Sequence, residues 1–139
     1  MIEKVGLLDE NLIRGQDLDW TSRMTLKGYE LLFDPLAQVV HIPEQYDLEK
    51  IRAYNHKSGF YAIQVRQNSP EIFRLPKILG ASFIMKLLSP FIAAVKTMKI
   101  FCNTKEVRQY WKTIPFIYLN KLSWCQGASK GLKVRQQNE

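Results

Sequence analysis

Two apolar segments in the second half of the chain restrict most strongly what it can fold into. The first runs from Ile78 to Phe101, and its stretch Ile78–Val95 contains one charge, Lys86, and one interior proline, Pro90. A membrane-spanning helix needs about 20 apolar residues with few or no charges. The first segment falls just short of this requirement, so the sequence predicts a helix that lies in a membrane interface rather than a clean span.

The second apolar segment runs from Tyr110 to Leu132 and is interrupted by three lysines, Lys112, Lys121 and Lys130. These charges again suit a helix whose basic side faces lipid headgroups. A re-entrant hairpin of the two segments is the other arrangement that the pattern allows. The polar residues 134–139 that follow are expected to form a disordered tail.

Charge is divided unevenly along the chain. Residues 1–76 have 9 lysines and arginines against 11 aspartates and glutamates, whereas residues 77–139 have 11 against only Glu106 and Glu139. The basic and apolar second half predicts an anionic membrane surface as a partner. Nucleic acid is disfavoured, because the basic residues alternate with long aliphatic runs rather than with a base-stacking pattern of aromatic residues.

Length and cysteine use set further bounds. A chain of 139 residues, 46% of them hydrophobic, can form one ordinary domain with a core. Its two cysteines, Cys102 and Cys125, lack the spacing of metal ligands, so free thiols in a reducing compartment are favoured over a disulfide. We therefore expect a protein at the cytoplasmic face of a membrane, in a peripheral, monotopic or re-entrant arrangement.

The stretch from Gly15 to Gly28 looks more like a site than any other part of the sequence. Residues 17–27 are expected to form a helix of about three turns. Asp17 and Asp19 lie in its first turn, where a carboxylate interacts favourably with the helix dipole. Arg23 follows Asp19 by four residues, which is the spacing of an ion pair. Acids in a first turn are commonly surface residues that compensate the dipole, and this interpretation stays open beside a functional one.

Two short runs with the composition of β-strands follow, Tyr29–Phe33 and Ala37–Ile42. A pair of strands alone is marginally stable in water, so these runs are expected to belong to a larger sheet that the chain does not contain. Residues 47–68 are predicted to form a long helix with Asp47 as its N-cap. The expected division is an α/β unit over residues 1–70 and membrane-associated helices over residues 71–133.

Five pieces of the first half occur in an order that is found in one enzyme family. They are Val5-Gly-Leu-Leu-Asp-Glu, Gly15-Gln-Asp-Leu-Asp-Trp-Thr-Ser-Arg23, Gly28-Tyr29, Phe33-Asp-Pro35 and Val39-Val-His41. In order and spacing they resemble the C-terminal portion of the catalytic domain of family-2 glycosyltransferases. The resemblance is strongest over residues 3–68. It implies the C-terminal part of a GT-A (Rossmann-like) α/β fold, followed by a helical, membrane-associated region.

The resemblance also assigns roles to individual residues. It implies that Asp17 is the general base of an inverting transfer, in which a sugar passes from a nucleotide-sugar donor to a glycan or lipid-linked acceptor. His41 matches a position that helps to hold a divalent metal, Mg or Mn, on the donor diphosphate. A histidine at a strand end is nearly as often an ordinary solvated or core residue. Acceptor-binding or supporting roles fall to four neighbours of the base: Gln16, Asp19, Trp20 and Arg23.

The chain departs from the family pattern in two ways. Gln16 stands where the family usually has Glu, which removes a charge beside Asp17. The family's nucleotide-binding strands and their Asp-x-Asp, which grips metal and diphosphate, have no counterpart, because Asp17-Leu18-Asp19 belongs to the acceptor side. The resemblance therefore implies a fragment that is inactive by itself. The alternative function is a non-catalytic, basic module that binds a membrane surface.

Overall fold

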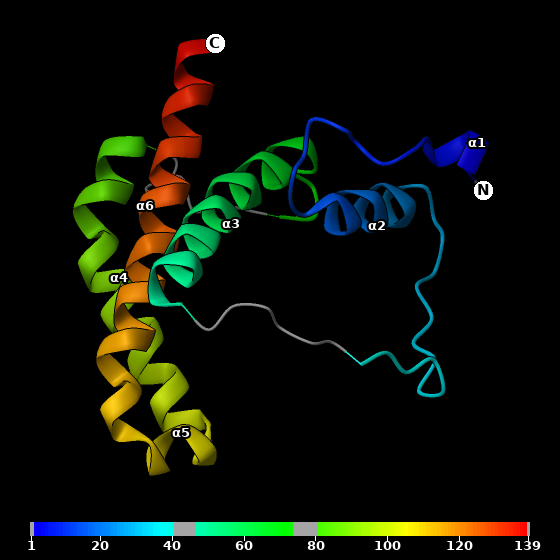
Figure 1. The fold of residues 1–139 in the computed structure, drawn as a ribbon. Helices are drawn as coiled ribbons and strands as arrows, with labels where there is room; N and C mark the ends of the chain where they lie inside the picture. Colours follow the sequence, from blue (N-terminus) through cyan, green and yellow to red (C-terminus); the bar gives the residue numbers. More distant parts are fainter. Residues whose placement is uncertain (1, 41–46, 74–80, 139) are drawn as a thin grey trace.

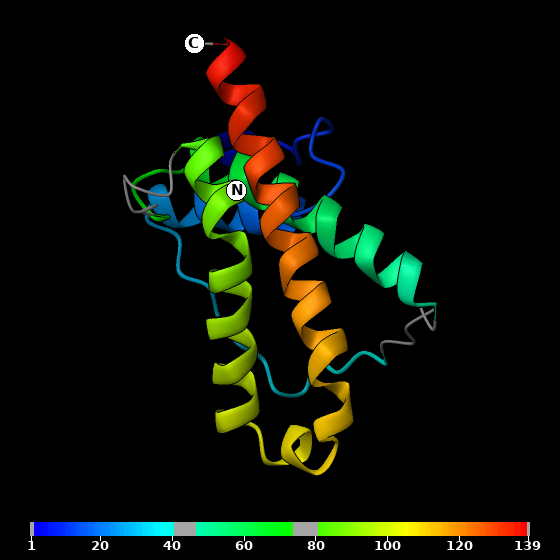
Figure 2. The same ribbon diagram turned by 90° about the vertical axis from the view of Figure 1, so that its left-hand side faces the viewer.

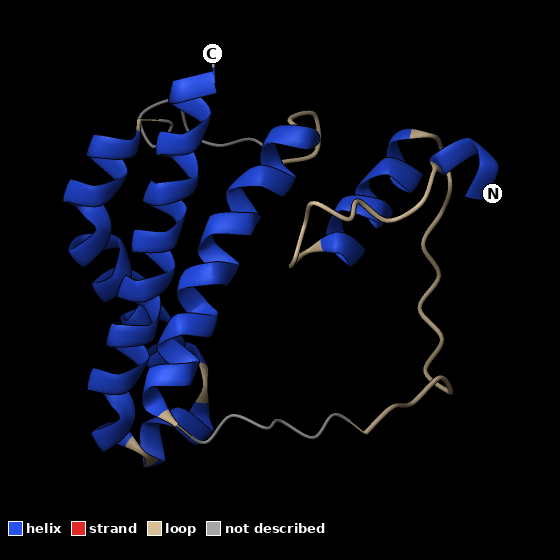
Figure 3. Ribbon diagram, turned by 45° about the horizontal axis from the view of Figure 1, so that its top comes forward, coloured by secondary structure: helices blue, strands red, loops and turns tan. Residues whose placement is uncertain are grey.

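The computed structural model describes residues 2–40, 47–73 and 81–138. Every regular element in these ranges is a helix, as Figure 3 shows. The elements are, in chain order, α1 (Ile2–Val5), α2 (Gln16–Leu26), α3 (Leu48–Asn68), α4 (Ser82–Asn103), α5 (Lys105–Gln109), the 3-10 helix η2 (Trp111–Thr113) and α6 (Ile114–Asn138).

The predicted α/β fold is wrong. The described ranges contain no strand and no sheet, so the chain is not a fragment of a GT-A domain, and the resemblance to family-2 glycosyltransferases fails at the level of the fold. The two β-rich runs lie in a loop over residues 29–40, in which five large apolar side chains are at least 87% exposed: Leu32, Phe33, Leu36, Val39 and Val40. A β-rich run becomes a strand only when a neighbouring strand accepts and donates its backbone hydrogen bonds. The end of the second run and His41 lie outside the described residues.

The largest part of the fold is an antiparallel hairpin of α4 and α6. Figures 1 and 2 show the two helices side by side, with α5 and η2 forming the turn at one end. Helix α3 packs on α6 at a steep angle, so α6 is the central element of the bundle. Helix α6 runs on to Asn138, through the positions for which the sequence predicts a disordered tail.

Local sequence rules explain where the helices begin and end. Helix α2 starts after Gly15 and stops before Gly28, and both glycines have a positive φ, which a residue with a side chain rarely adopts. Helix α3 is capped by Asp47, whose carboxylate accepts a hydrogen bond from the backbone N–H of Glu49 at 3.0 Å. The predicted helices 17–27 and 47–68 are therefore confirmed to within one residue at each end.

Glycines make the contact between α3 and α6. A Cβ built on Gly59 would overlap the carbonyl oxygen of Trp124, and a Cβ on Gly127 would overlap that of His56. At Gly131 the nearest atom to such a Cβ is the carbonyl oxygen of Phe60, at 2.9 Å. The two backbones can approach this closely only because these positions carry no side chain.

Small side chains also fill the contact between α4 and α6. Ser89, Ala93 and Thr97 are buried on the inner face of α4 together with the larger Met85, and Cys125 and Ala128 are buried on α6 together with Leu132. The hydroxyls of Ser89 and Thr97 donate to the carbonyl oxygens four residues earlier in the same helix, both at 2.7 Å. This bonding satisfies the hydroxyls without a partner across the interface.

Arg23 holds the N-terminal part of the structure together. Its Nε pairs with Asp19 Oδ2 at 2.9 Å, and its two terminal nitrogens donate to the carbonyl oxygens of Val5 and Leu7 at 2.7 and 2.8 Å. Asn68 of α3 donates to the other oxygen of Asp19 at 3.3 Å. One arginine thus connects the end of α1 and the following loop to a carboxylate that also reaches α3.

Candidate functional site

The outer face of α4 carries large apolar side chains. Phe83, Leu87, Phe91, Val95 and Met98 recur at intervals of four and three residues, so they form a single stripe along the helix. We call these five residues the outer stripe. They are 52–75% exposed, whereas the opposite side of α4 buries small residues against α6. A helix of a water-soluble bundle usually shows the reverse arrangement.

Aromatic residues extend this apolar surface around the turn of the hairpin. Tyr110, Trp111 and Phe116 lie at or next to η2, and all three are exposed. Figure 2 shows this turn at the end of the hairpin away from the C-terminus. Tyrosine and tryptophan combine an apolar ring with a polar group, which favours positions where one end is apolar and the other is wet.

The hairpin is strongly basic. Between Ser82 and Val134 the sequence has nine lysines and arginines but one acidic residue, Glu106. Among the described residues the single ion pair is that of Arg23 with Asp19, so the basic side chains of the hairpin have no carboxylate partner in that part of the structure. No described helix is both long enough and apolar enough to cross a membrane.

A basic pocket lies between the C-terminal part of α4 and the N-terminal third of α6. Its volume is about 300 Å³, and it is lined by Lys96, Lys99, Ile100, Asn103, Thr104 and Lys121. The ammonium group of Lys96 lies 4.6 Å from the centre of the Trp124 ring. Burial raises the pKa of the neighbouring Cys125 thiol, and the positive charges of Lys96 and Lys121 counteract part of that rise. Both charges therefore act on one place between the helices.

A second, larger cavity holds Asp17. Its volume is about 590 Å³, and α2, α3 and α6 all contribute to its lining: Arg14, Gly15, Asp17, Leu18, Tyr54, Ser58, Tyr61, Ala62, Val65 and Trp124. The guanidinium of Arg14 stacks 3.7 Å from the centre of the Tyr54 ring. An exposed carboxylate beside three aromatic rings could bind a ligand that has both hydroxyl groups and an apolar face.

The other predicted site residues do not line this cavity. Gln16 donates to the carbonyl oxygen of Asp9 at 3.3 Å, and the indole of Trp20 donates to that of Gly6 at 3.0 Å. The predicted ion pair between Asp19 and Arg23 is confirmed, and Asp19 is buried in it. These four residues support the loop before α2, while their part in acceptor binding stays a prediction.

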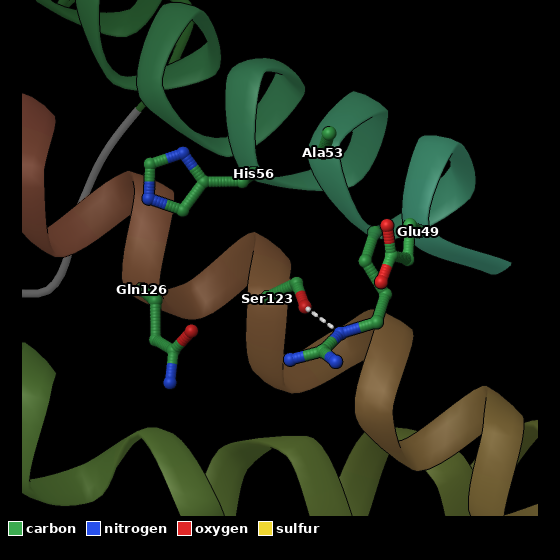
Figure 4. Close-up of a pocket in the computed structure, with 6 residues that line it drawn as sticks. Glu49, Ala53, His56, Ser123 and Gln126 are labelled. Carbon is green, nitrogen blue, oxygen red and sulfur yellow. Dashed lines mark hydrogen bonds between the residues drawn. The ribbon is translucent and has the colours of Figure 1, made fainter.

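A third pocket shows residues that the sequence reasoning missed. Figure 4 shows His56 of α3 reaching toward α6, opposite Ser123 and Gln126, in a cavity of about 310 Å³ that Glu49, Arg52 and Ala53 also line. Arg52 Nε donates to Ser123 Oγ at 3.5 Å, which is a long hydrogen bond. The sequence predicts the helix over residues 47–68, but nothing in it indicates that this helix packs against α6.

The described ranges contain no group of side chains suited to bind a metal ion. Within residues 2–40, 47–73 and 81–138, no three His, Cys, Asp or Glu side chains lie close enough together to hold a metal ion. The single metal ligand that the sequence suggested, His41, is outside those ranges.

Comparisons with known proteins add no relative. No protein-family model matches the chain, and no significant similarity is found to a curated protein or to a solved structure.

Proposed function

We propose that this protein is a membrane-surface binding module whose α4–α6 hairpin lies in the interfacial layer of an anionic bilayer. The observation that carries the proposal is the outer stripe, a continuous apolar face on a helix that is too polar overall to cross a membrane. An amphipathic helix in this position buries its apolar face at the boundary between headgroups and acyl chains. Each stripe side chain contributes about 1.5–3 kcal/mol when it leaves water completely.

The packing inside the hairpin supports lipid as the occupant of this face. Helices in water associate by burying their large apolar side chains, whereas helices in lipid gain nothing from that and associate through small residues. Here three of the four buried residues of α4 are small, namely Ser89, Ala93 and Thr97, and the small residues Cys125 and Ala128 are buried on α6. Met85 is buried, but the five large side chains of the outer stripe are left on the outside of α4, where acyl chains would surround them.

The charge of the hairpin supports an anionic bilayer. Each lysine or arginine close to an anionic membrane contributes about 1 kcal/mol to binding at low salt. Lys86 and Lys99 lie on either side of the outer stripe on α4 and are exposed. Tyr110 and Trp111 at the turn suit the headgroup level of the same bilayer.

Vesicle co-sedimentation tests this function. The wild-type chain is expected to bind vesicles of phosphatidylcholine with phosphatidylglycerol, and to be released in part by salt. The double variant Leu87→Gln/Phe91→Gln should bind at least about tenfold more weakly. The matched control is Leu32→Gln/Leu36→Gln, which removes two apolar side chains outside the hairpin that are even more exposed than Leu87 and Phe91, and it should leave binding unchanged.

Two outcomes would contradict the proposal. The first is that the wild-type chain does not bind these vesicles at low salt. The second is a stripe variant that binds as well as the control. If sedimentation velocity instead shows a wild-type dimer that the stripe variant converts to a monomer, and vesicles do not bind, a second copy of the chain covers the stripe and the membrane proposal fails.

We propose sugar transfer as a second candidate, now on a helical scaffold, because Asp17 lies in the aromatic-lined cavity with Tyr54, Tyr61 and Trp124. In this reaction Asp17 accepts the proton of an acceptor hydroxyl as its oxygen bonds to the anomeric carbon of a nucleotide sugar and the nucleoside diphosphate leaves. Aromatic faces stack on the apolar faces of sugar rings, and the carboxylate accepts hydrogen bonds from hydroxyls.

A turnover assay with nucleotide sugars and a mixture of glycan acceptors tests this second candidate. Turnover by the wild-type chain should be lost in Asp17→Asn and kept in Glu30→Gln, which neutralises an exposed acid in the loop. The asparagine variant keeps the size of the side chain but cannot accept the proton. Equal turnover in both variants, or none in the wild type, would remove the assignment.

A further inference from the structure

Three lysines from two helices line one pocket that contains no acidic residue. Lys96 and Lys99 come from α4 and Lys121 comes from α6. The remaining polar lining is neutral, since it consists of Asn103 and Thr104. Lys96 and Lys99 lie three residues apart on α4, where two positive side chains repel each other weakly, and an anion in the pocket would relieve that repulsion.

The helix dipole accounts for only part of this arrangement. The C-terminal end of α4 carries a partial negative charge, which attracts a lysine in its last turns such as Lys99. It does not explain Lys121, which lies in the N-terminal third of α6, is half-buried and acts with Lys96 on the same buried thiol, that of Cys125. Lys96 is also positioned, because its ammonium lies over the Trp124 ring at 4.6 Å.

We propose that this pocket binds a phosphate group, with Lys96, Lys99 and Lys121 as its cationic contacts and with Asn103 and Thr104 able to donate hydrogen bonds. Ammonium groups that carry several donors suit a compact oxyanion that can accept from more than one direction. The volume of about 300 Å³ is ample for a phosphate group and its ester substituent. The inference rests on the proposed membrane function for one of its two sources of phosphate, a lipid headgroup, and the other source is a soluble phosphate ester.

The probe for the soluble source is sn-glycerol 1-phosphate. Its binding is followed by the indole N–H resonance of Trp124, which senses Lys96 directly and is assigned with Trp20→Phe and Trp111→Phe variants. The wild-type chain should show a saturable shift of this resonance. The shift should strengthen from pH 5 to pH 7, because the second phosphate proton is lost near pH 6.

Matched charge variants separate a pocket from a diffuse basic surface. Lys96→Gln/Lys121→Gln removes one charge from α4 and one from α6 inside the pocket, and Lys86→Gln/Lys130→Gln removes one from each helix outside it. The pocket variant should bind glycerol phosphate at least about tenfold more weakly, and the outer variant should bind like the wild type. The single variant Lys99→Gln, at an exposed position, provides a second measurement if the double pocket variant folds poorly.

Vesicles containing phosphatidic acid are the probe for the lipid source, compared with phosphatidylglycerol vesicles of equal surface charge. Preference for phosphatidic acid that is lost in the pocket variant supports a headgroup in the pocket. Equal loss of glycerol phosphate binding in both double variants overturns the pocket. If the wild-type chain binds vesicles but does not bind glycerol phosphate and shows no preference for phosphatidic acid, the pocket is overturned and the membrane function stands. If it binds glycerol phosphate but not vesicles, the pocket stands and the membrane function is overturned.

Discussion

Ser82 and Ser129 join α4 to α6 by a reciprocal pair of hydrogen bonds. Each hydroxyl donates to the backbone carbonyl oxygen of the other residue, in both cases at 2.9 Å, and the two hydroxyl oxygens lie 3.3 Å apart. Ser82 is the first residue of α4 and Ser129 lies in the C-terminal half of α6. The pair therefore closes the end of the hairpin that lies opposite the turn formed by α5 and η2.

Removing either hydroxyl should destabilise the hairpin. A net hydrogen bond is worth about 1 kcal/mol, so Ser82→Ala and Ser129→Ala should each lower the free energy of unfolding by roughly that amount. Because both bonds depend on the same close approach, a double-mutant cycle in urea should give a coupling energy of about 0.5 kcal/mol or more. Ser89→Ala combined with Ser129→Ala is the control and should be additive, since the Ser89 hydroxyl bonds within its own helix.

Gly127→Ala should destabilise the protein, against the usual effect of this substitution. In an exposed helix interior the change from glycine to alanine gains about 1 kcal/mol. Here the new methyl group would overlap the carbonyl oxygen of His56, which is backbone and cannot rotate away. We expect a loss of about 1–3 kcal/mol in thermal or urea unfolding. Gln126→Ala, at the exposed neighbouring position, should have little effect, and a Gly127→Ala protein more stable than wild type would contradict the α3–α6 contact.

Arg23→Ala should detach the N-terminal part of the chain. Asp19 is 2% exposed, so loss of its partner leaves a buried carboxylate without a counterion. Breaking a buried pair in this way costs about 3–5 kcal/mol, and the partial exposure of Arg23 favours the lower end. Limited proteolysis should then cut within residues 2–26 faster than in wild type. Arg23→Ala/Asp19→Asn should recover part of the stability, because it removes the orphaned charge. Failure of that recovery would argue against an electrostatic cause.

Cys125 should make the protein less stable as the solution becomes alkaline. Burial raises the pKa of this thiol above its ordinary value of about 8.5, so above that pH the unfolded state releases the proton while the folded state still holds it. Stability is therefore complete below the unfolded pKa and declines as the pH rises toward the higher folded pKa. Cys125→Ala should flatten the slope of unfolding free energy against pH between about 8 and 10. Cys102→Ala, at an exposed thiol, is the control and should leave the slope unchanged.

Local rules made the helices of the first half predictable. The N-cap of Asp47, the glycine after α2 and the four-residue spacing of Asp19 and Arg23 are properties of adjacent residues, and all three appear in the structure. The prediction that the two β-rich runs form strands was wrong, because it too used only adjacent residues. A β-rich composition shows that a segment is suited to a sheet, but the described ranges contain no sheet that residues 29–40 could join.

The candidate sites were less predictable, because each is assembled from distant parts of the chain. The turn-apart spacing of Lys96 and Lys99 was visible in the sequence, but the approach of Lys121 depends on how α6 packs on α4. The sequence singled out Asp17, but no residue near it in the sequence indicated that Trp124 would line the same cavity. The spacing of Gly127 and Gly131 was a usable signal of close helix packing that the sequence reasoning did not use.

The arrangement of α4 has a consequence for which sequences this fold can tolerate. In an ordinary amphipathic helix the buried positions must stay apolar and the outer positions accept almost any polar residue. On α4 the restrictions are reversed. Ser89 and Ala93 are restricted by volume, so even valine or leucine should be rejected there, and leucine should be rejected at Thr97. At Leu87 and Phe91 large apolar residues should exchange freely, whereas a charge should cost attachment rather than folding. A saturation scan scored separately for folding and for vesicle attachment would therefore divide α4 lengthwise into two independent sets of positions.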